Sequence, residues 1–277
     1  MIEAQPTSST ELKGFHFESL AQAGVVHGVT GRQGGVSREP FESLDLSVKT
    51  GDDPDSVQQN RRRVEEVIGP GRFRVVIGRL THGSEVTIFK QGSLMPPLSP
   101  PAVGDWSMFE SDAAISDVPG VVMLMTFADC VPILLLDIEH QACGLAHAGW
   151  RGTAGRISSK TVAAMAGAFG TDPAAVQAAI GPSIGSCCYT VGRDVREAVC
   201  DGYGELGEGF FEDDRLDLWR ANVADLQSIG VLSENITVSG ICTRLHSYHF
   251  FSHRGDGGQT GRFGAWIGLI AAAEEPA

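Results

Sequence analysis

Two short apolar runs, separated by a few mostly polar residues, constrain the fold of this chain more than any other feature. Residues 131–136 read VPILLL and residues 142–146 read ACGLA, and the intervening residues 137–141 read DIEHQ. Continuous apolar runs of this length, bounded by polar residues, are typical of strands that are buried on both faces. We therefore predict an antiparallel hairpin in the interior of a β-sheet.

The ends of this hairpin carry a cysteine and a histidine. If the two runs pair around residues 138–141, Cys130 faces Gly149 and His147 lies opposite Pro132. Facing side chains of antiparallel strands lie about 5 Å apart, so we predict that Cys130 and His147 meet at the open end. Asp129 precedes the cysteine. It either caps a turn or acts beside the site, where it orients a ligand or carries a proton.

A second histidine follows another predicted strand. Residues 73–80 (FRVVIGRL) read as a strand, and His82 stands in the THGS sequence directly after it. His82, Cys130 and His147 form the two-histidine, one-cysteine set of a catalytic zinc with an open fourth position. We predict one Zn²⁺ per chain on these three residues. Copper uses the same set with a weak methionine, but Met123 and Met125 precede Cys130 within a strand, so copper is the second choice.

The other predicted elements are clustered strands with interspersed helices. We predict helices at residues 54–67, 153–169, 191–199 and 216–229, and strands at residues 25–29, 73–80, 85–89, 121–125, 176–180, 236–241 and 265–270. Asp53 suits the N-cap of the first helix and Gly170 the C-cap of the second. Strict strand–helix alternation is absent, so the pattern favours α+β with mixed sheets. The proline-rich residues 91–105 read as a loop.

Charge and composition exclude several classes of partner. The formal net charge is −13, with 34 acidic and 21 basic residues, so we predict no nucleic-acid partner. The first residues lack the pattern of a secretory signal, and no apolar run approaches the about 18 residues of a membrane span. We predict a cytoplasmic protein that does not contact membranes. In that compartment the six cysteines should be free thiols.

Arginines in or beside glycine-rich segments indicate an anion site. Arg32, Arg61 and Arg151 are our candidates for phosphate contacts, because the arginine fork matches phosphate oxygens. Arg151 also opens a predicted helix, whose free N–H groups favour an anion.

Seven sequence blocks resemble a known family. They are HGVTGRQGGVS, THGSEV, SDAAIS, TFADCVPILLLD, GLAHAGWRGT, AIGPSIGSCCYTVG and FFSHRGDGGQTGR, and they cover about residues 25–270. In this order they resemble the laccase-domain proteins. These are the YfiH/DUF152 group, also called the peptidoglycan editing factor family and now generally regarded as purine nucleoside phosphorylases.

The resemblance implies a CNF1/YfiH-like fold of two similar halves with mixed sheets and flanking helices. It implies a single catalytic domain over residues 14–273 after a loose segment 1–13. It also implies one zinc on His82, Cys130 and His147, with phosphorolysis of adenosine, inosine, guanosine and methylthioadenosine and a side activity of adenosine deamination. Nucleoside and phosphate would be the partners of a monomer or homodimer.

Some positions depart from the family pattern. Leu80 and Thr81 stand where the family has Gln-Val, Asp45 replaces an asparagine, and His253 and Gly255 replace a tyrosine and an arginine. These changes spare the metal set and affect the substrate contacts.

Three alternatives remain open. The first is a metal-free hydrolase or amidase of cell-wall precursors, with Cys130 as the nucleophile and His147 as the base. The second is a non-enzymatic binding module. The third, ranked below the other readings, is a copper polyphenol oxidase, and it could not use a multicopper centre, because the chain has eight histidines and no His-X-His pair.

Overall fold

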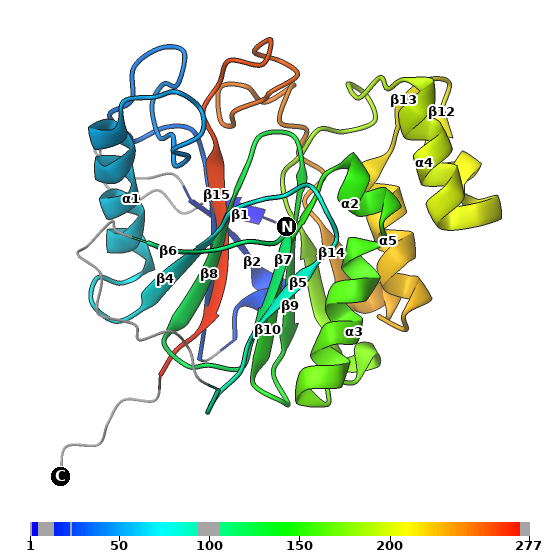
Figure 1. Cartoon of the computed structure of the whole chain (residues 1–277), viewed down its shortest axis with the longest axis horizontal. Helices are drawn as coiled ribbons and strands as arrows, with labels where there is room; N and C mark the ends of the chain where they lie inside the picture. The colour runs from blue at the N-terminus through cyan, green and yellow to red at the C-terminus, as the bar shows by residue number, and fades with distance from the viewer. Residues whose placement is uncertain (1, 5–13, 23, 94–105, 272–277) are drawn as a thin grey trace.

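Two mixed β-sheets pack face to face, and helices cover the outer side of each sheet (Figure 1). The computed structural model describes residues 2–4, 14–22, 24–93 and 106–271. The predicted loop at residues 91–105 and the predicted loose segment 1–13 therefore fall mostly outside the described residues. The α+β class with mixed sheets and flanking helices is confirmed.

The first sheet joins the two ends of the described chain. Its strands are β1 (Ile2–Ala4), β2 (Gly14–Phe17), β3 (Val25–Thr30), β4 (Arg74–Gly78), β6 (Ser107–Phe109), β8 (Val121–Phe127) and β15 (Phe263–Leu269). They lie in the order β1-β2-β3-β15-β8-β4-β6. β15 pairs antiparallel with β3 and β8, whereas β4 is parallel to β8 and β6.

The second sheet contains the predicted hairpin. Its strands are β5 (Val86–Phe89), β7 (Ala113–Ser116), β9 (Val131–Asp137), β10 (Ala142–Ala148), β11 (Gln177–Ile180) and β14 (Ile236–Val238). They lie in the order β14-β11-β9-β10-β7-β5, with β9 and β10 in the middle and buried along their whole length. The hairpin is confirmed. β6 and β7 were not predicted, and β14 is shorter than the predicted strand 236–241.

Alternate residues of the central strands fill the core between the sheets. Leu134 and Leu136 of β9 share one buried cluster with Met123 and Met125 of β8. Because successive side chains of a strand point to opposite faces, a strand with apolar residues at every position can pack on both sides. The continuous run VPILLL thus places β9 between the opposite sheet and the helices.

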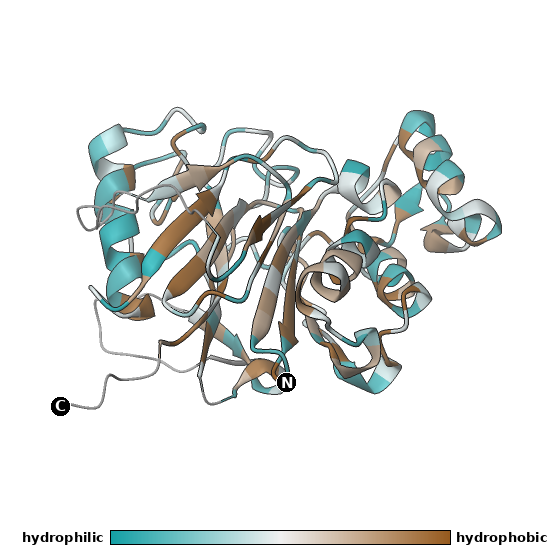
Figure 2. Ribbon diagram, turned by 60° about the horizontal axis from the view of Figure 1, so that its bottom comes forward, coloured by the Kyte–Doolittle hydropathy of each residue, from teal (hydrophilic) through white to brown (hydrophobic). Residues whose placement is uncertain are grey.

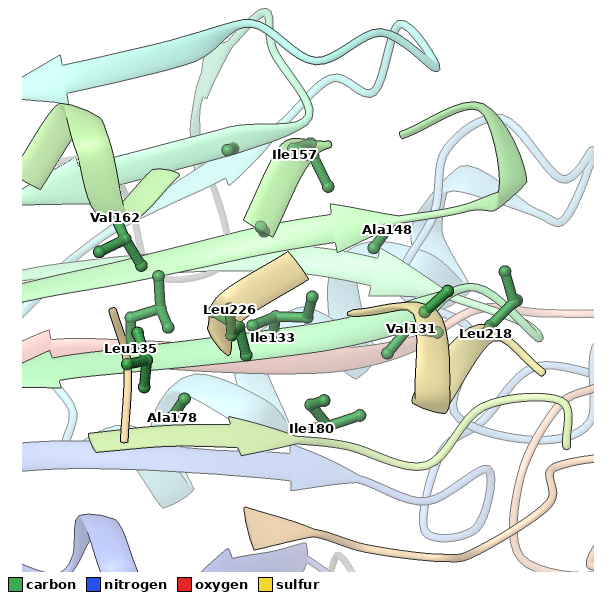
Figure 3. Close-up of a cluster of buried hydrophobic side chains, with 14 of the residues drawn as sticks. Val131, Ile133, Leu135, Ala148, Ile157, Val162, Ala178, Ile180, Leu218 and Leu226 are labelled. Atoms are coloured by element: carbon green, nitrogen blue, oxygen red, sulfur yellow. The ribbon is translucent and has the colours of Figure 1, made fainter. Parts of the chain in front are cut away.

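The helices are α1 (Pro54–Ile68), α2 (Trp150–Ala154), α3 (Ile157–Phe169), α4 (Arg193–Tyr203) and α5 (Leu218–Ser228). Short 3₁₀ helices are η1 (Glu18–Leu20), η2 (Pro173–Ala175), η3 (Gly204–Phe210) and η4 (Ser233–Asn235), and β12 (Phe211–Glu212) pairs with β13 (Arg215–Leu216). Ile133 and Leu135 of β9 pack against Val162 of α3 and Leu226 of α5 (Figure 3).

α1 covers the outer side of the first sheet. Val64 and Ile68 of the helix pack on Val122 and Leu124 of β8. The opposite side of α1 is hydrophilic, as the teal helix at the left edge of Figure 2 shows. The N-cap prediction is confirmed, because the Asp53 side chain accepts a hydrogen bond from the first turn.

The predicted helix at residues 153–169 is wrong at its start. The chain forms two helices there, α2 and α3, which Gly155 and Arg156 separate. Arg156 takes a left-handed conformation (φ 60°). Its guanidinium pairs with Asp225 and lies 4.6 Å from the Tyr203 ring centre. These tertiary contacts, which helical periodicity does not reveal, fix the break.

The other helices agree more closely with the sequence. Gly170 is the left-handed C-cap of α3, as predicted. α4 begins two residues later than predicted and continues to Tyr203. Within the described ranges, no helix is long and apolar enough to cross a membrane.

Candidate functional site

The open end of the β9–β10 hairpin brings Cys130 and His147 together. His147 lies opposite Pro132 in the antiparallel register, as predicted. The sulfur of Cys130 lies over Gly149, since a methyl group on that glycine would come within 3.0 Å of it. Glycine at this position therefore leaves space for the thiol. The Cys130 side chain is also close enough to the His147 ring to raise its pKa.

His82 reaches the same place from the loop after β4. Its backbone turns sharply, with a φ of 61°, and its ring centre lies 5.6 Å from that of His147. His82, Cys130 and His147 all line the same two cavities. We call these three side chains the rim set. The structure thus brings together the three residues that the sequence predicted as ligands.

Asp112 bonds to His147 and to the two residues that flank His82, and the sequence did not single it out. One carboxylate oxygen, Oδ1, lies 3.0 Å from Nδ1 of His147. The other, Oδ2, accepts hydrogen bonds from the Thr81 N–H (3.0 Å), the Thr81 hydroxyl (2.7 Å) and the Gly83 N–H (2.9 Å), on either side of His82. The available signal was the SDAAIS block, in which an aspartate stands just before a buried strand.

The two histidines of the rim set and Asp112 have shifted pKa values. Burial alone would lower the pKa of His147, but Cys130 and the Asp112 carboxylate outweigh it and raise this pKa to about 9. Burial would likewise raise the pKa of Asp112, but hydrogen bonds from His147, Gly83 and Thr81 lower it to about 2. Burial and the neighbouring His147 lower the pKa of His82.

The residue types of the rim set match a zinc site, although the ligand atoms that lie within 4.8 Å of one another here are those of His82, Asp112 and His147 and do not include the Cys130 sulfur. Two imidazoles and a thiolate are common zinc ligands, and three protein ligands leave one position for water or substrate. With Nδ1 of His147 bonded to Asp112, its Nε2 is the nitrogen that can ligate, which is the usual carboxylate–histidine arrangement around zinc. An Asp112 oxygen also lies within 4.8 Å of ligand atoms of both histidines. Because its two oxygens already receive four donors, we regard Asp112 as a positioning residue.

Asp129 lies beside the rim set but has structural partners. It is buried, and its backbone is left-handed, with a φ of 83°. One carboxylate oxygen accepts the Thr243 hydroxyl and the other the Arg254 N–H, both at 2.6 Å. The carboxylate thus ties residues 243–254 to the hairpin. Its role as a proton carrier stays a prediction.

One cavity, of about 290 Å³, combines apolar walls with arginines. We call it the first cavity. Its apolar lining includes Ile77, Leu80 and Met108, and its cationic lining includes Arg61 and Arg262. The walls can therefore accept a flat, mostly apolar group beside polar contacts.

Asp45, one of the departures from the family pattern, positions part of this lining. It is buried and accepts hydrogen bonds from the N–H groups of Arg262 (2.8 Å) and Ser47 (3.0 Å). The Arg61 guanidinium donates to the Leu46 carbonyl and lies 5.1 Å from the centre of a Trp106 ring. Arg61 is thus next to the rim set, but part of its guanidinium already binds the backbone.

A second cavity, of about 330 Å³, lies on the other side of the rim set. We call it the second cavity. Arg151 and Arg254 line it together with Trp150, Tyr189 and the glycines of the GWRG sequence. The Arg151 guanidinium lies 4.1 Å from a Trp150 ring centre, and Arg254 lies 5.2 Å from that of Tyr189. Both cations are therefore held close to the wall by aromatic rings.

Arg32 lies elsewhere. It donates to the carbonyls of Glu42 and Ser247 and stacks 4.7 Å from the Phe251 ring centre. It lines a different surface pocket, with Tyr248 among its neighbours. Of the three arginines predicted to bind phosphate, the structure brings Arg61 and Arg151 to the rim set and not Arg32.

His253 and Arg254 line the site although the sequence did not place them among the site residues: the sequence marks His253 only as a departure from the family pattern, and Arg254 only as one of several loop arginines. His253 lines both cavities, and Arg254 the second. Both belong to the FFSHRGDGGQTGR block, so the signal was the glycine-rich sequence itself. Gly255 has little space, because a methyl group there would come within 2.9 Å of the Ser252 hydroxyl.

Comparison with known proteins places this site in context. Residues 26–270 match the family model described as "Multi-copper polyphenol oxidoreductase laccase". Purine nucleoside phosphorylase YlmD of Geobacillus stearothermophilus is 37% identical over 89% of this chain and 90% of its own length. A purine nucleoside phosphorylase of Deinococcus radiodurans is 39% identical over 88% and 89% of the two chains.

A solved structure has the same fold. The crystal structure of the hypothetical protein YfiH of Bacillus licheniformis superposes with a TM-score of 0.84 at 32% identity, over 92% of this chain and 96% of that one. The CNF1/YfiH-like fold that the sequence blocks implied is therefore confirmed.

Proposed function

This chain belongs to the family described as multi-copper polyphenol oxidoreductase laccase, and from that premise we propose that it is a zinc-dependent purine nucleoside phosphorylase. The names of its relatives support a phosphorylase of this type. The proposed substrates are phosphate with adenosine, inosine, guanosine or methylthioadenosine, and the products are the free base and ribose-1-phosphate, or its methylthio analogue. Adenosine deamination is the proposed side activity.

One observation carries the proposal: the rim set forms a common wall of two cavities. Phosphorolysis needs a nucleoside and a phosphate side by side. We assign the nucleoside to the first cavity, because its apolar residues suit a base and a ribose. We assign the phosphate to the second cavity, because Arg151 and Arg254 both line it and because Asp112 and Asp129, which also line it, already accept hydrogen bonds from other groups.

The reaction transfers a glycosyl group. A phosphate oxygen bonds to the anomeric carbon, the bond from that carbon to the purine nitrogen breaks, and its electron pair leaves with the purine, which takes up a proton. Arg151 and Arg254 hold the phosphate near the anomeric carbon, which lowers the entropic cost of bringing two substrates together. His82, Cys130 and His147 would hold the zinc ion, which would supply a Lewis acid when bound.

Deamination forms and breaks different bonds from phosphorolysis. Water adds at the ring carbon that carries the amino group, and ammonia leaves. Asp129 is the proposed proton carrier, because its carboxylate lies beside Cys130. It would have to release one of its two present partners, Thr243 or the Arg254 N–H. This requirement agrees with deamination as the slower activity.

The test is an assay of purified protein with inosine, with and without phosphate. We expect hypoxanthine and ribose-1-phosphate in equal amounts and only when phosphate is present. We also expect Cys130→Ala to lose both the products and one equivalent of zinc. The absence of both products from zinc-loaded wild-type protein would refute the phosphorylase.

A second candidate function rests on a different observation. Cys130, His147 and Asp112 stand in the order nucleophile, base and orienting carboxylate, which is the arrangement of a cysteine hydrolase. Such an enzyme would act without metal on an amide of a cell-wall precursor. Iodoacetamide separates the two functions: activity that survives zinc removal but is lost on alkylation of Cys130 supports the hydrolase, and the opposite result supports the phosphorylase.

A further inference from the structure

Three cysteines outside the rim set form a second group of soft ligands. Cys187 and Cys188 lie in the loop that follows β11, and Cys242 lies in the segment that follows β14. Their sulfur atoms all lie within 4.8 Å of one another. The sulfurs of Cys187 and Cys188 are 3.7 Å apart. Segments more than fifty residues apart in sequence thus bring three thiols to one point.

The backbone fixes this arrangement. The Cys188 N–H donates to the Gly185 carbonyl (2.9 Å), which curls residues 185–188 into a tight turn. Ser183 pairs with the segment that carries Cys242 through its N–H to the Ile241 carbonyl and through its carbonyl to the Thr243 N–H, at 3.2 and 3.0 Å. These hydrogen bonds hold the two segments in register and leave little freedom in where the sulfurs stand.

The surroundings of the cluster are closely packed. A methyl group on Gly185 would come within 3.0 Å of the Trp219 ring and 3.3 Å of the Cys187 sulfur. Cys242 is only 3% exposed, Cys188 is half-buried, and Cys187 faces solvent. The group therefore has a closed floor and one open side, through which an ion can enter.

We propose that Cys187, Cys188 and Cys242 bind a thiophilic closed-shell ion, zinc or cuprous copper, as a second metal site of this chain. Thiolates select these ions over harder ones. With a zinc–sulfur bond of about 2.3 Å, two sulfurs that share a tetrahedral ion lie about 3.8 Å apart. The measured 3.7 Å separation matches this geometry and is far from the ~2 Å of a disulfide.

One ligand is prepared for the ion. The Gly185 N–H lies 3.3 Å from the Cys242 sulfur and points at it. Burial acts to raise the pKa of this thiol, but backbone N–H groups, Gly185 among them, and the neighbouring Cys187 thiol outweigh burial and lower it, whereas burial and the neighbouring thiols raise the pKa of Cys187 to about 12. Cys187 and Cys188 release their protons when the ion binds, because only the thiolate is a good ligand.

An ion at this cluster would cross-link two walls of the second cavity. Tyr189 follows Cys188 directly and lines that cavity. Thr243 follows Cys242 directly and bonds to Asp129 at 2.6 Å. The ion would thus have a structural role: it would hold the loop after β11 and the segment after β14 in place around the phosphate position.

The experiment counts bound metal in the whole protein after chelation and reloading. Apoprotein receives Zn²⁺ in one arm and Cu⁺, under anaerobic reducing conditions, in the other. We expect the double variant Cys187→Ser/Cys188→Ser to bind one equivalent less than wild type of at least one of the two ions. Cys200→Ser is the matched control. This cysteine lies on α4 beside Glu208, so its replacement should leave the count unchanged.

A spectroscopic readout isolates the cluster from the rim set. In a Cys130→Ser background, the remaining thiolate–cobalt absorption of Co²⁺-loaded protein should come from the three-cysteine site. It should disappear in the triple variant that also carries Cys187→Ser and Cys188→Ser. The arm in which the extra equivalent resists a competing chelator identifies zinc or copper. Equal metal counts in wild type and the double variant for both ions would overturn the proposal.

Discussion

His147 of the second sheet and His27 of the first are both buried, with exposed fractions of 3% and 6%, but their surroundings differ. His27 lies on β3, and its Nε2 accepts the Phe17 N–H at 3.1 Å. Burial, followed by the neighbouring His16, lowers its pKa to about 4. This histidine is therefore a neutral residue of the core.

His147 is just as buried, but its partners are a carboxylate and a thiol. Cys130 and Asp112 outweigh burial and raise its pKa to about 9. Burial by itself lowers the pKa of a histidine and leaves it neutral. A carboxylate on one ring nitrogen and a thiol near the ring instead make the histidine suitable as a base or a metal ligand.

Replacing each histidine by alanine tests this difference most strongly. We expect His147→Ala to lose one equivalent of zinc and to lower the rate of phosphorolysis on the order of 100-fold or more, because a ligand is removed. His27→Ala should cost about 1–3 kcal/mol of unfolding free energy and keep the metal. Metal analysis and an inosine assay check both. Loss of zinc from His27→Ala would contradict the conclusion that His27 is only a core residue.

Acid should destabilise the protein through His27. Its folded pKa of about 4 lies below the ordinary 6.5, so the folded state binds fewer protons than the unfolded state between these values. The stabilisation is complete above pH 6.5, falls as the pH decreases, and has been lost by pH 4, with a total of up to about 3 kcal/mol. Urea unfolding of metal-free wild type and His27→Gln should show a steeper pH slope in the wild type, because the lowered pKa of His82 contributes to the slope of both proteins. An equal slope in both proteins would assign it to other groups.

Asp112→Asn tests whether the carboxylate that orients His147 contributes to metal affinity. The amide keeps the shape but loses the charge that orients His147, so zinc should bind about 10- to 100-fold more weakly. Chelator competition measures this. Asp137→Asn is the matched control, since Asp137 also bonds to a histidine, His140, at 2.8 Å but at the other end of the hairpin. Equal losses in both variants would indicate a general effect on the fold.

The smallest expected effect is on the KM for phosphate, and it should distinguish Arg151 from Arg32. Arg151→Ala should raise the KM for phosphate about 10-fold and leave the KM for inosine unchanged, because it removes one charged hydrogen-bond donor. Arg32→Ala, in a different pocket, should change neither by more than about twofold. Initial rates with varied phosphate check this. A larger effect of Arg32→Ala would restore Arg32 as a phosphate ligand.

Local sequence was enough for the hairpin and for its two functional ends. The apolar runs, the polar turn and the strand period fix which residues of β9 and β10 face each other, so the meeting of Cys130 and His147 follows from neighbouring residues alone. The N-cap at Asp53 and the C-cap at Gly170 were equally local. Signals of this kind depend on the residues within one or two turns of chain.

Contacts between distant segments could not be predicted in this way. Asp112 reaches His147 across thirty-five residues, and Arg156 breaks a helix because Asp225 and Tyr203 lie nearby. Arg32 and Arg151 looked alike in sequence, since each lies in a glycine-rich segment. Only the packing of the chain decided that they line different pockets.

The sequence by itself determined the α+β class, the central hairpin and the residues at its open end, because periodicity and turn residues act over a few positions. The tertiary structure decided which carboxylate orients His147, which arginines reach the rim set and which cysteines meet. Such choices depend on how two sheets and their loops pack. Their free energy comes from contacts between residues that the sequence keeps far apart.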